Sequence, residues 1–142
     1  MIVVVDTNVL VSGLLSAFGP PSRILDLLLT GDLQLAYDDR IRIEYHQVLA
    51  RPRFGFDANE IAKVLDYLLG NGVAVTAHPL AVGLSDFSDA PFLEVAVELS
   101  VPLITGNVKH FPETQRYGVP IFSPVDFLTW WATRSMSDAG RG

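Results

Sequence analysis

The sequence contains no cysteine and no long apolar run, and these absences narrow the classes of protein to consider. Without cysteine, neither disulfides nor thiolate chemistry can contribute to stability or function. Only three histidines are present, and they are too scattered to favour a zinc site. No apolar run reaches the roughly 18 residues that a membrane-spanning helix needs. Basic residues are also few, because 10 Lys and Arg stand against 16 Asp and Glu.

The formal charge of −6 argues against a protein that binds nucleic acid through its whole surface, since such proteins usually present a basic face. A local basic patch, a set of carboxylates around a divalent cation, or a basic protein partner all remain compatible with this charge. The N-terminus lacks the basic region and long apolar core of a signal peptide, so we expect a cytoplasmic protein without a membrane segment. The hydrophobic content of 49% suits one compact domain over residues 1–134, followed by a disordered tail over 135–142.

The opening residues form the element around which the rest of the chain is arranged. Ile2 to Val5 are a short run of β-branched residues that ends at Asp6. This run is too continuous for a half-exposed strand, so it predicts a strand buried on both faces. Ligands of open α/β sheets collect beyond the carboxyl ends of the strands. Asp6 therefore marks the edge of the sheet at which we expect a functional site.

Strand-like and helical patterns alternate along the rest of the chain. Further strands are expected at 33–37, 73–75, 101–105 and 119–122. Helices are expected at 9–15, from a Ser22 cap to Gly31, from Asp38 or Asp39 to 49, from Asp57 to Gly70 or Gly72, from Asp89 to 100, and after a Ser123 cap. This alternation predicts an α/β domain of three layers, in which a five-stranded parallel sheet carries helices on both faces.

Several carboxylates are expected to converge at the carboxyl edge of this sheet. The candidate residues are Asp6, Glu44, Asp89 and Asn107, with Asp86 one turn before Asp89. Glu44 lies on the buried edge of its helix, three residues from Ile41 and four from Val48. Carboxylates gathered in a partly dry crevice raise one another's pKa, so we expect a divalent cation among them. Oxygen ligands suit Mg²⁺ or Mn²⁺, which can support hydrolysis of a phosphodiester.

Each candidate also has a purely structural interpretation. Asp6 and Asp89 both suit helix N-caps, and Glu44 suits an ion pair with Arg40 or Arg42 on its own helix. The asparagine beside Gly106 suits a turn. It is the joint arrangement, with acids after the first strand, after the second and before the fourth, that favours a site.

Two other phosphate chemistries are disfavoured by the residues that follow the first strand. The segment Asp6-Thr-Asn-Val contains no glycine-rich loop, so it matches neither a Walker A motif nor a dinucleotide fingerprint. A phosphatase with an aspartate nucleophile needs a second aspartate two residues after the first, and Asn8 occupies that position.

Basic and aromatic side chains suggest surfaces around the acidic centre. The residues that could contact phosphates are Arg40, Arg42, Arg51, Arg53, Lys109 and His110, and we retain Arg51, Arg53 and Lys109 as candidates. A solvated face is the alternative for all of them. Trp130 and Trp131 are expected to make core or dimer contacts.

Taken in order, these motifs resemble the PIN domain. The matching residues are Asp6-Thr7-Asn8 with Ser12, then Glu44-Tyr45 and Arg51-Pro52-Arg53-Phe54, then Asp86 with Asp89, then Thr105-Gly106-Asn107 with Lys109-His110-Phe111. The resemblance runs from residue 1 to about residue 130. The chain is similar to small prokaryotic PIN proteins of the virulence-associated protein C type, which are described as toxins of toxin–antitoxin systems.

The resemblance implies an endoribonuclease that depends on Mg²⁺ or Mn²⁺ and serves as the toxin of a type II toxin–antitoxin pair. It implies a parallel sheet of order 3-2-1-4-5. It implies that Asp6, Glu44 and Asp89 are catalytic metal ligands and that Asp86 is a further candidate ligand. It also implies that Asn107 is a catalytic residue. The supporting residues that it implies are Thr7, Asn8, Ser12 and Thr105. The implied partners are RNA, a protein antitoxin and a second copy of the chain.

One departure from the family keeps an alternative open. The family often has aspartate where this chain has Asn107, and an amide contributes no charge to a second metal ion. A catalytically silent PIN-like scaffold that binds RNA or protein is therefore the competing interpretation. The retention of the other acids favours the enzyme.

Overall fold

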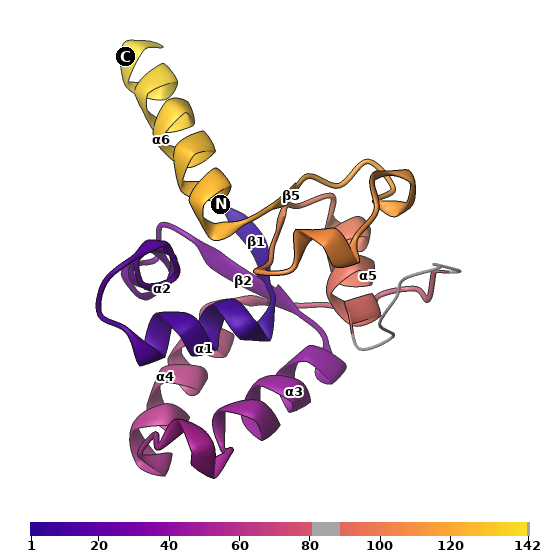
Figure 1. Ribbon diagram of the computed structural model, residues 1–142. Coiled ribbons are helices and arrows are strands. Elements are labelled where there is room, and N and C mark those ends of the chain that lie inside the picture. The colour runs from indigo at the N-terminus through magenta and orange to yellow at the C-terminus, as the bar shows by residue number, and fades with distance from the viewer. Residues whose placement is uncertain (81–88, 142) are drawn as a thin grey trace.

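The N-terminal strand lies at the centre of a parallel sheet in the computed structural model, which describes residues 1–80 and 89–141 (Figure 1). β1 (Ile2–Val5) pairs with β2 (Gln34–Tyr37) on one side and with β4 (Leu103–Ile104) on the other. β3 (Val73–Ala74) and β5 (Ile121–Phe122) complete the order β3-β2-β1-β4-β5, and every pairing is parallel. This confirms the expected sheet and its strand order.

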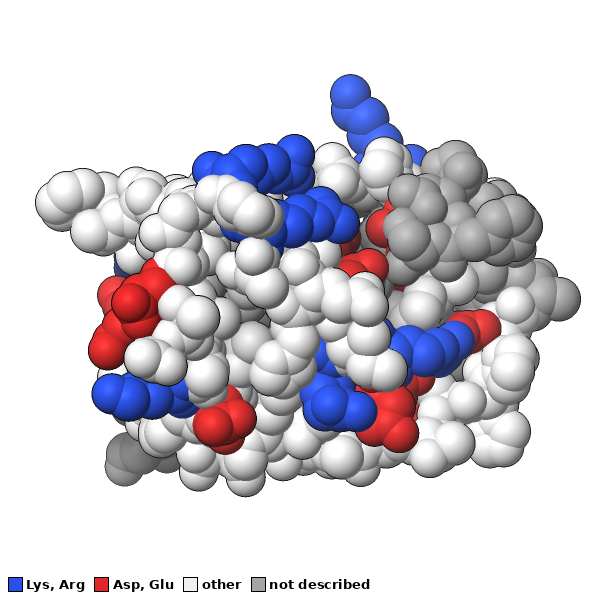
Figure 2. All heavy atoms as spheres, turned by 90° about the horizontal axis from the view of Figure 1, so that it is seen from below, with Lys and Arg blue, Asp and Glu red and all other residues white. Residues whose placement is uncertain are grey.

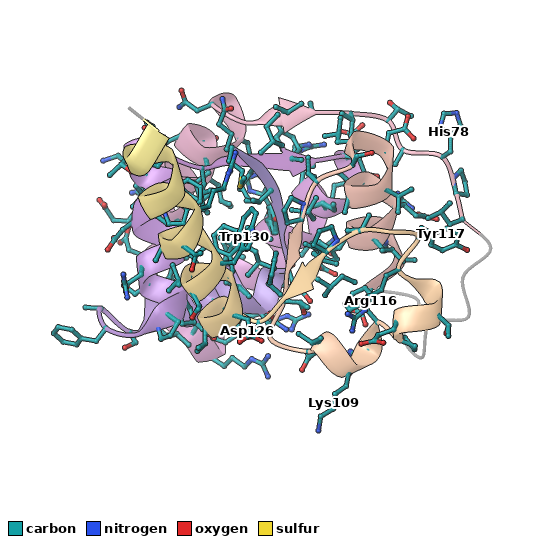
Figure 3. All side chains as sticks on the ribbon, turned by 90° about the horizontal axis from the view of Figure 1, so that it is seen from above. His78, Lys109, Arg116, Tyr117, Asp126 and Trp130 are labelled. Carbon is teal, nitrogen blue, oxygen red and sulfur yellow. The ribbon has the colours of Figure 1, made fainter. Side chains whose placement is uncertain are left out.

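Helices cover both faces of the sheet. They are α1 (Thr7–Leu15), α2 (Pro20–Thr30), α3 (Asp39–Leu49), α4 (Ala58–Gly70), α5 (Ala90–Leu99) and α6 (Pro124–Arg141), and the short 3-10 helices are η1 (Pro52–Phe54), η3 (Val108–His110) and η4 (Glu113–Gln115). α5 packs on β1, β2 and β4, whereas α2 packs on α1 and α6. Seen from above, α5 and α6 lie on opposite sides of the strands (Figure 3). The three-layer α/β architecture is therefore confirmed.

The start of α2 differs from the prediction. The helix begins at Pro20, with Gly19 at its N-cap, so the expected cap at Ser22 is wrong. Proline suits the first helical position because its missing N–H would have no partner there. Ser22 instead lies within the first turn and is buried.

The predicted caps of three other helices are confirmed. Asp38 accepts a hydrogen bond from the Ile41 amide in α3, and Asp57 accepts one from the Glu60 amide in α4. Ser123 Oγ accepts one from the third residue of α6. The last helix extends to Arg141, so its backbone includes 135–141, which the sequence predicts to be disordered. A domain boundary at 134 stays a prediction.

The core is continuous through the sheet and includes a group of aromatic residues on α6. The side chains of Val3, Val4 and Val5 are fully buried, as a central parallel strand requires. Phe127, also fully buried, contacts Trp130 and Trp131 at ring-centroid distances of 5.7 and 6.1 Å. The two tryptophans thus make the core contacts that the sequence offered as one of two alternatives. Within the described ranges, no helix is both long and apolar enough to cross a membrane.

Candidate active site

Asp6 is the first residue beyond the central strand. Its amide donates to the Ile104 carbonyl of β4, which fixes the backbone between the two central strands. The residue is only 6% exposed, and Thr105 Oγ1 donates a hydrogen bond of 2.8 Å to Asp6 Oδ2. The carboxylate is therefore held at the carboxyl edge of the sheet, where the sequence predicts the site.

Asp89 lies before the first turn of α5 and is 7% exposed. Its side chain makes no cap hydrogen bond to the helix, so the interpretation of Asp89 as a conventional N-cap is not supported. Asp89 Oδ2 lies 3.0 Å from Nδ1 of His110. The cap position brings Asp89 to the sheet edge, while its carboxylate is directed to other partners.

The charges of these two acids act on each other. Burial raises the pKa of Asp6 above its ordinary value, the hydrogen bond from Thr105 lowers it, and the negative charge of Asp89 raises it further. The net effect is a raised pKa, because desolvation is the largest contribution. Two buried carboxylates that repel each other fit a divalent cation, which would relieve the repulsion with oxygen ligands.

Two consecutive residues of α3 form hydrogen bonds with the residues on either side of Asp6. Glu44 accepts a short hydrogen bond from Thr7 Oγ1, and the Tyr45 hydroxyl donates to the Val5 carbonyl at 2.5 Å. Tyr45 is fully buried, which raises its pKa well above the ordinary value, and the charges of Asp6 and Glu44 add to this effect. These two hydrogen bonds thus connect α3, which carries Glu44, to the residues that flank Asp6.

Among the described residues, the two arginines that the structural interpretation paired with Glu44 form ion pairs with other acids. Arg40 pairs with Asp38 and with Glu94, and Arg42 pairs with Asp39. Glu44 is half-buried, in agreement with its predicted position on the edge of the apolar stripe.

The turn after β4 contributes the next part of the site. The Asn107 amide donates to Thr105 Oγ1 at 3.0 Å, and the same hydroxyl donates to the Asp6 carboxylate. Thr105 therefore connects Asn107 with Asp6. Gly106 donates its amide to Asn8 Oδ1, and a Cβ on Gly106 would lie only 3.3 Å from that oxygen. Glycine thus permits the close approach of the two loops.

A hollow of about 280 Å³ opens beside these loops. Its lining residues are Asn8, Val9, Ser12, Pro21, Gly106, Asn107 and Pro124. Ser12 and Asn107 are both exposed, so their polar groups can meet a ligand there. The structure therefore brings Asn8, Ser12 and Asn107 together around this hollow, whereas Thr7 and Thr105 contact Glu44 and Asp6.

The predicted basic contacts come from separate elements. Arg51 and Arg53 are exposed at η1, and the guanidinium of Arg53 lies 4.8 Å from the centre of the Phe54 ring. Lys109 is exposed on η3 and points away from the protein (Figure 3). Seen from below, Asp and Glu side chains appear in a recess, and Lys and Arg side chains lie beside it (Figure 2).

The full set of predicted ligands is not assembled in the described part of the chain. Asp86 lies outside the described residues. Among residues 1–80 and 89–141, no group of three or more acidic or histidine side chains is close enough to hold a metal ion. What the structure brings together is the interacting pair Asp6 and Asp89, with Glu44 joined to Asp6 through the adjacent Thr7.

A second group of buried acids, which the sequence did not indicate, gathers around Arg40. Arg40 donates to Glu94 at 2.6 Å and forms a salt bridge of 2.7 Å with Asp38. Glu94, which is 4% exposed, also accepts the Leu80 amide at 2.6 Å. A glutamate inside the apolar pattern of α5 was the available signal. This group ties α3, α5 and the segment before residue 81 together.

Comparison with known proteins agrees with the observed fold. A family model described as a PIN domain matches residues 2–109, which is well over half of the chain. No curated protein matches the sequence. PIN domains have a nuclease-type fold, generally act as hydrolases on nucleic acid, and typically use divalent metals. From its fold and this match, the chain belongs to the PIN domain family.

Proposed function

We propose that this protein is a divalent-metal-dependent endoribonuclease, the toxin of a type II toxin–antitoxin pair. One observation carries the proposal: Asp6, buried at the end of the central strand, has its pKa raised by burial and by the charge of Asp89. A fold retains such repulsion at the expense of stability, and perturbed acids in this position are candidates for functional sites.

The acids would hold Mg²⁺ or Mn²⁺ through Asp6, Glu44 and Asp89, with Asp86 as a further candidate ligand. When bound, such an ion lowers the pKa of water and neutralises charge on a phosphate. Thr105 fixes the Asp6 carboxylate and Thr7 fixes Glu44. Asn107, which lines the hollow, would orient water or the substrate by hydrogen bonds from its amide.

The RNA would contact the basic side chains outside the acidic recess. Arg51, Arg53 and Lys109 are exposed, as phosphate contacts require. These contacts position a nucleic acid without reading its sequence. A local basic set of this kind is compatible with the net charge of −6.

A protein antitoxin and a second copy of the chain are the proposed protein partners, in the cytoplasm. The acidic surface suits an antitoxin with a basic segment, because complementary charge favours association. For the homodimer we propose the aromatic face of α6. There, Trp131 and Leu128 line a hollow of about 230 Å³ together with residues of α2.

The proposal is tested by measuring Mn²⁺ binding by calorimetry and cleavage of a labelled RNA on the same preparations. The preparations are wild type, Asp6→Asn and the control Asp66→Asn, which changes an exposed aspartate on α4 in the same way. We expect wild type and the control to bind and cleave, and Asp6→Asn to lose at least about 100-fold in cleavage.

A wild-type protein that is free of copurified inhibitor, yet neither binds Mn²⁺ nor cuts RNA, would refute the nuclease proposal. The catalytically silent scaffold would then account for the fold and for the uncharged Asn107.

A further inference from the structure

His110 is held in a fixed place between the candidate site and the core. Its amide donates to the Asn107 carbonyl at 2.9 Å, which closes the single turn of η3. The next residue, Phe111, is fully buried and donates its amide to Val108. The backbone of His110 is thus anchored on one side by a candidate site residue and on the other by the core.

The ring of His110 meets a carboxylate rather than a phosphate-binding surface. Its Nδ1 lies 3.0 Å from Asp89 Oδ2, and the Asp89 side chain is 10% exposed. An ionised carboxylate can only accept, so the imidazole must carry its proton on Nδ1 in this contact. The sequence grouped His110 with the basic residues that contact phosphates, and the structure gives it this other partner.

The contact with His110 restrains the rotation of the Asp89 carboxylate. The Asp89 side chain makes no cap hydrogen bond to α5. An imidazole N–H on one oxygen limits rotation about the Cβ–Cγ bond. Partners that hydrogen-bond metal-ligating carboxylates orient those ligands, and their loss typically lowers metal affinity about 10- to 100-fold.

We propose that His110 is a positioning residue for Asp89: through its Nδ1–H it holds the carboxylate in the orientation that contributes to binding a divalent cation. This inference rests on the proposed function, because it assumes that Asp89 is a metal ligand. It gives the Lys-His-Phe segment of the turn after β4 a role in the site. His110 itself acts through Asp89 and contacts neither the cation nor the RNA.

The test compares Mn²⁺ affinity, measured by calorimetry, among variants of one residue. His110→Asn places an amide N–H near the position of Nδ1, whereas His110→Gln places it near Nε2, and His110→Ala removes the donor. We expect His110→Ala and His110→Gln to lose about tenfold or more in affinity and His110→Asn to stay within about threefold of wild type. His46→Ala, at an exposed histidine of α3, is the matched control and should bind like wild type.

Two further measurements separate positioning from folding. Thermal unfolding in metal-free buffer should show all variants folded, because the His110 side chain is 39% exposed. Nitrogen-15 spectra of the metal-free wild type should show the Nδ1–H form of the His110 ring, and Asp89→Ala should abolish that preference. A wild-type ring protonated on Nε2 alone would overturn the inference.

Failure of the inference is distinguishable from failure of the proposed function. If wild type binds Mn²⁺ and cleaves RNA while all three His110 variants bind within about twofold of it, the inference is wrong and the nuclease stands. If His110→Asn is as weak as His110→Ala, the imidazole acts in another way and the inference is again wrong. A wild-type protein that binds no Mn²⁺ would contradict both the inference and the proposed function.

Discussion

Asp38 and Glu94 are as buried as Asp6 and Asp89, with exposures of 7% and 4% against 6% and 7%. The first two acids share the guanidinium of Arg40, which reaches both within 2.7 Å. In the second pair, the charge of one acid raises the pKa of the other. Two pairs of equal burial in one small domain thus differ in whether a fixed cation stands between the acids.

The difference separates a structural use of buried charge from a functional one. A buried acid that is paired with arginine and hydrogen-bonded has its desolvation offset within the fold, so removing a partner is costly. A buried acid beside another acid retains an electrostatic cost that a ligand can relieve. Substitution in the two groups should therefore change stability in opposite directions.

The largest effect is expected for Glu94→Ala, which breaks the neutralised group. It leaves the Leu80 amide and one side of Arg40 without their acceptor. We expect the free energy of unfolding to fall by about 2–3 kcal/mol, less than for a fully buried pair because Arg40 is 45% exposed. Urea unfolding measures this loss. Glu98→Ala, on the same helix but paired with the exposed His78, should have a much smaller effect, and equal losses would contradict the comparison.

The next effect is expected for Tyr45→Phe, which removes the hydrogen bond that α3 makes to β1. The Val5 carbonyl would lose a donor inside the core, at a cost of about 1–2 kcal/mol in the free energy of unfolding. Tyr67→Phe is the matched control, since the Tyr67 hydroxyl donates to the Leu29 carbonyl at an exposed position. If both variants lose the same stability in urea, the buried bond has no special weight in supporting the site.

The smallest effect is a gain in the free energy of unfolding, which is expected for Asp6→Asn in metal-free buffer. The amide removes the repulsion by Asp89 and can still accept from Thr105 through its oxygen. We expect the free energy of unfolding to rise on the order of 1 kcal/mol, as is common when a functional residue is replaced. Added Mn²⁺ should stabilise wild type and leave this variant unchanged.

The pH dependence of this gain follows from the direction of the pKa shift. Asp6 has a raised pKa in the folded protein, so its favourable contribution is complete below the ordinary value of 3.8 and is lost as the pH rises through the folded value. The variant should therefore show little gain in acid and its full gain at neutral pH. A gain that is greatest in acid would mean that the Asp6 carboxylate is stabilised by the fold.

The sheet, and the positions of Asp6 and Asp89 at the ends of secondary-structure elements, could be predicted from local sequence because both depend on short-range patterns. The β-branched run before Asp6 indicates a buried strand, and the proline after Asp89 indicates the start of a helix. Asp6 and Asp89 are therefore assigned to element ends without any knowledge of tertiary contacts. The predicted Ser22 cap of α2 is wrong because Gly19 and Ser22 are both possible N-caps, and Pro20 favours a helix that begins directly after Gly19.

The contacts that give the acids their different roles could not be predicted in this way. Arg40 and Glu94 are 54 residues apart, and His110 and Asp89 are 21 apart. From sequence alone, Arg40 has Glu44 one turn away as an equally reasonable partner. Which arginine meets which acid depends on how α3 and α5 pack against each other, and periodicity within one helix contains no such information.

The position of β1 in the middle of the sheet has a consequence for the order of events in folding. Asp6 and its partner Thr105 are separated by 99 residues, and β1 has its β4 neighbour only after that length of chain exists. Contacts between such distant residues form slowly, because the intervening loop must first be closed. During synthesis the first strand leaves the ribosome long before the strand that completes the sheet edge. A growing chain therefore cannot assemble the Asp6–Thr105 contact until most of the domain has been made.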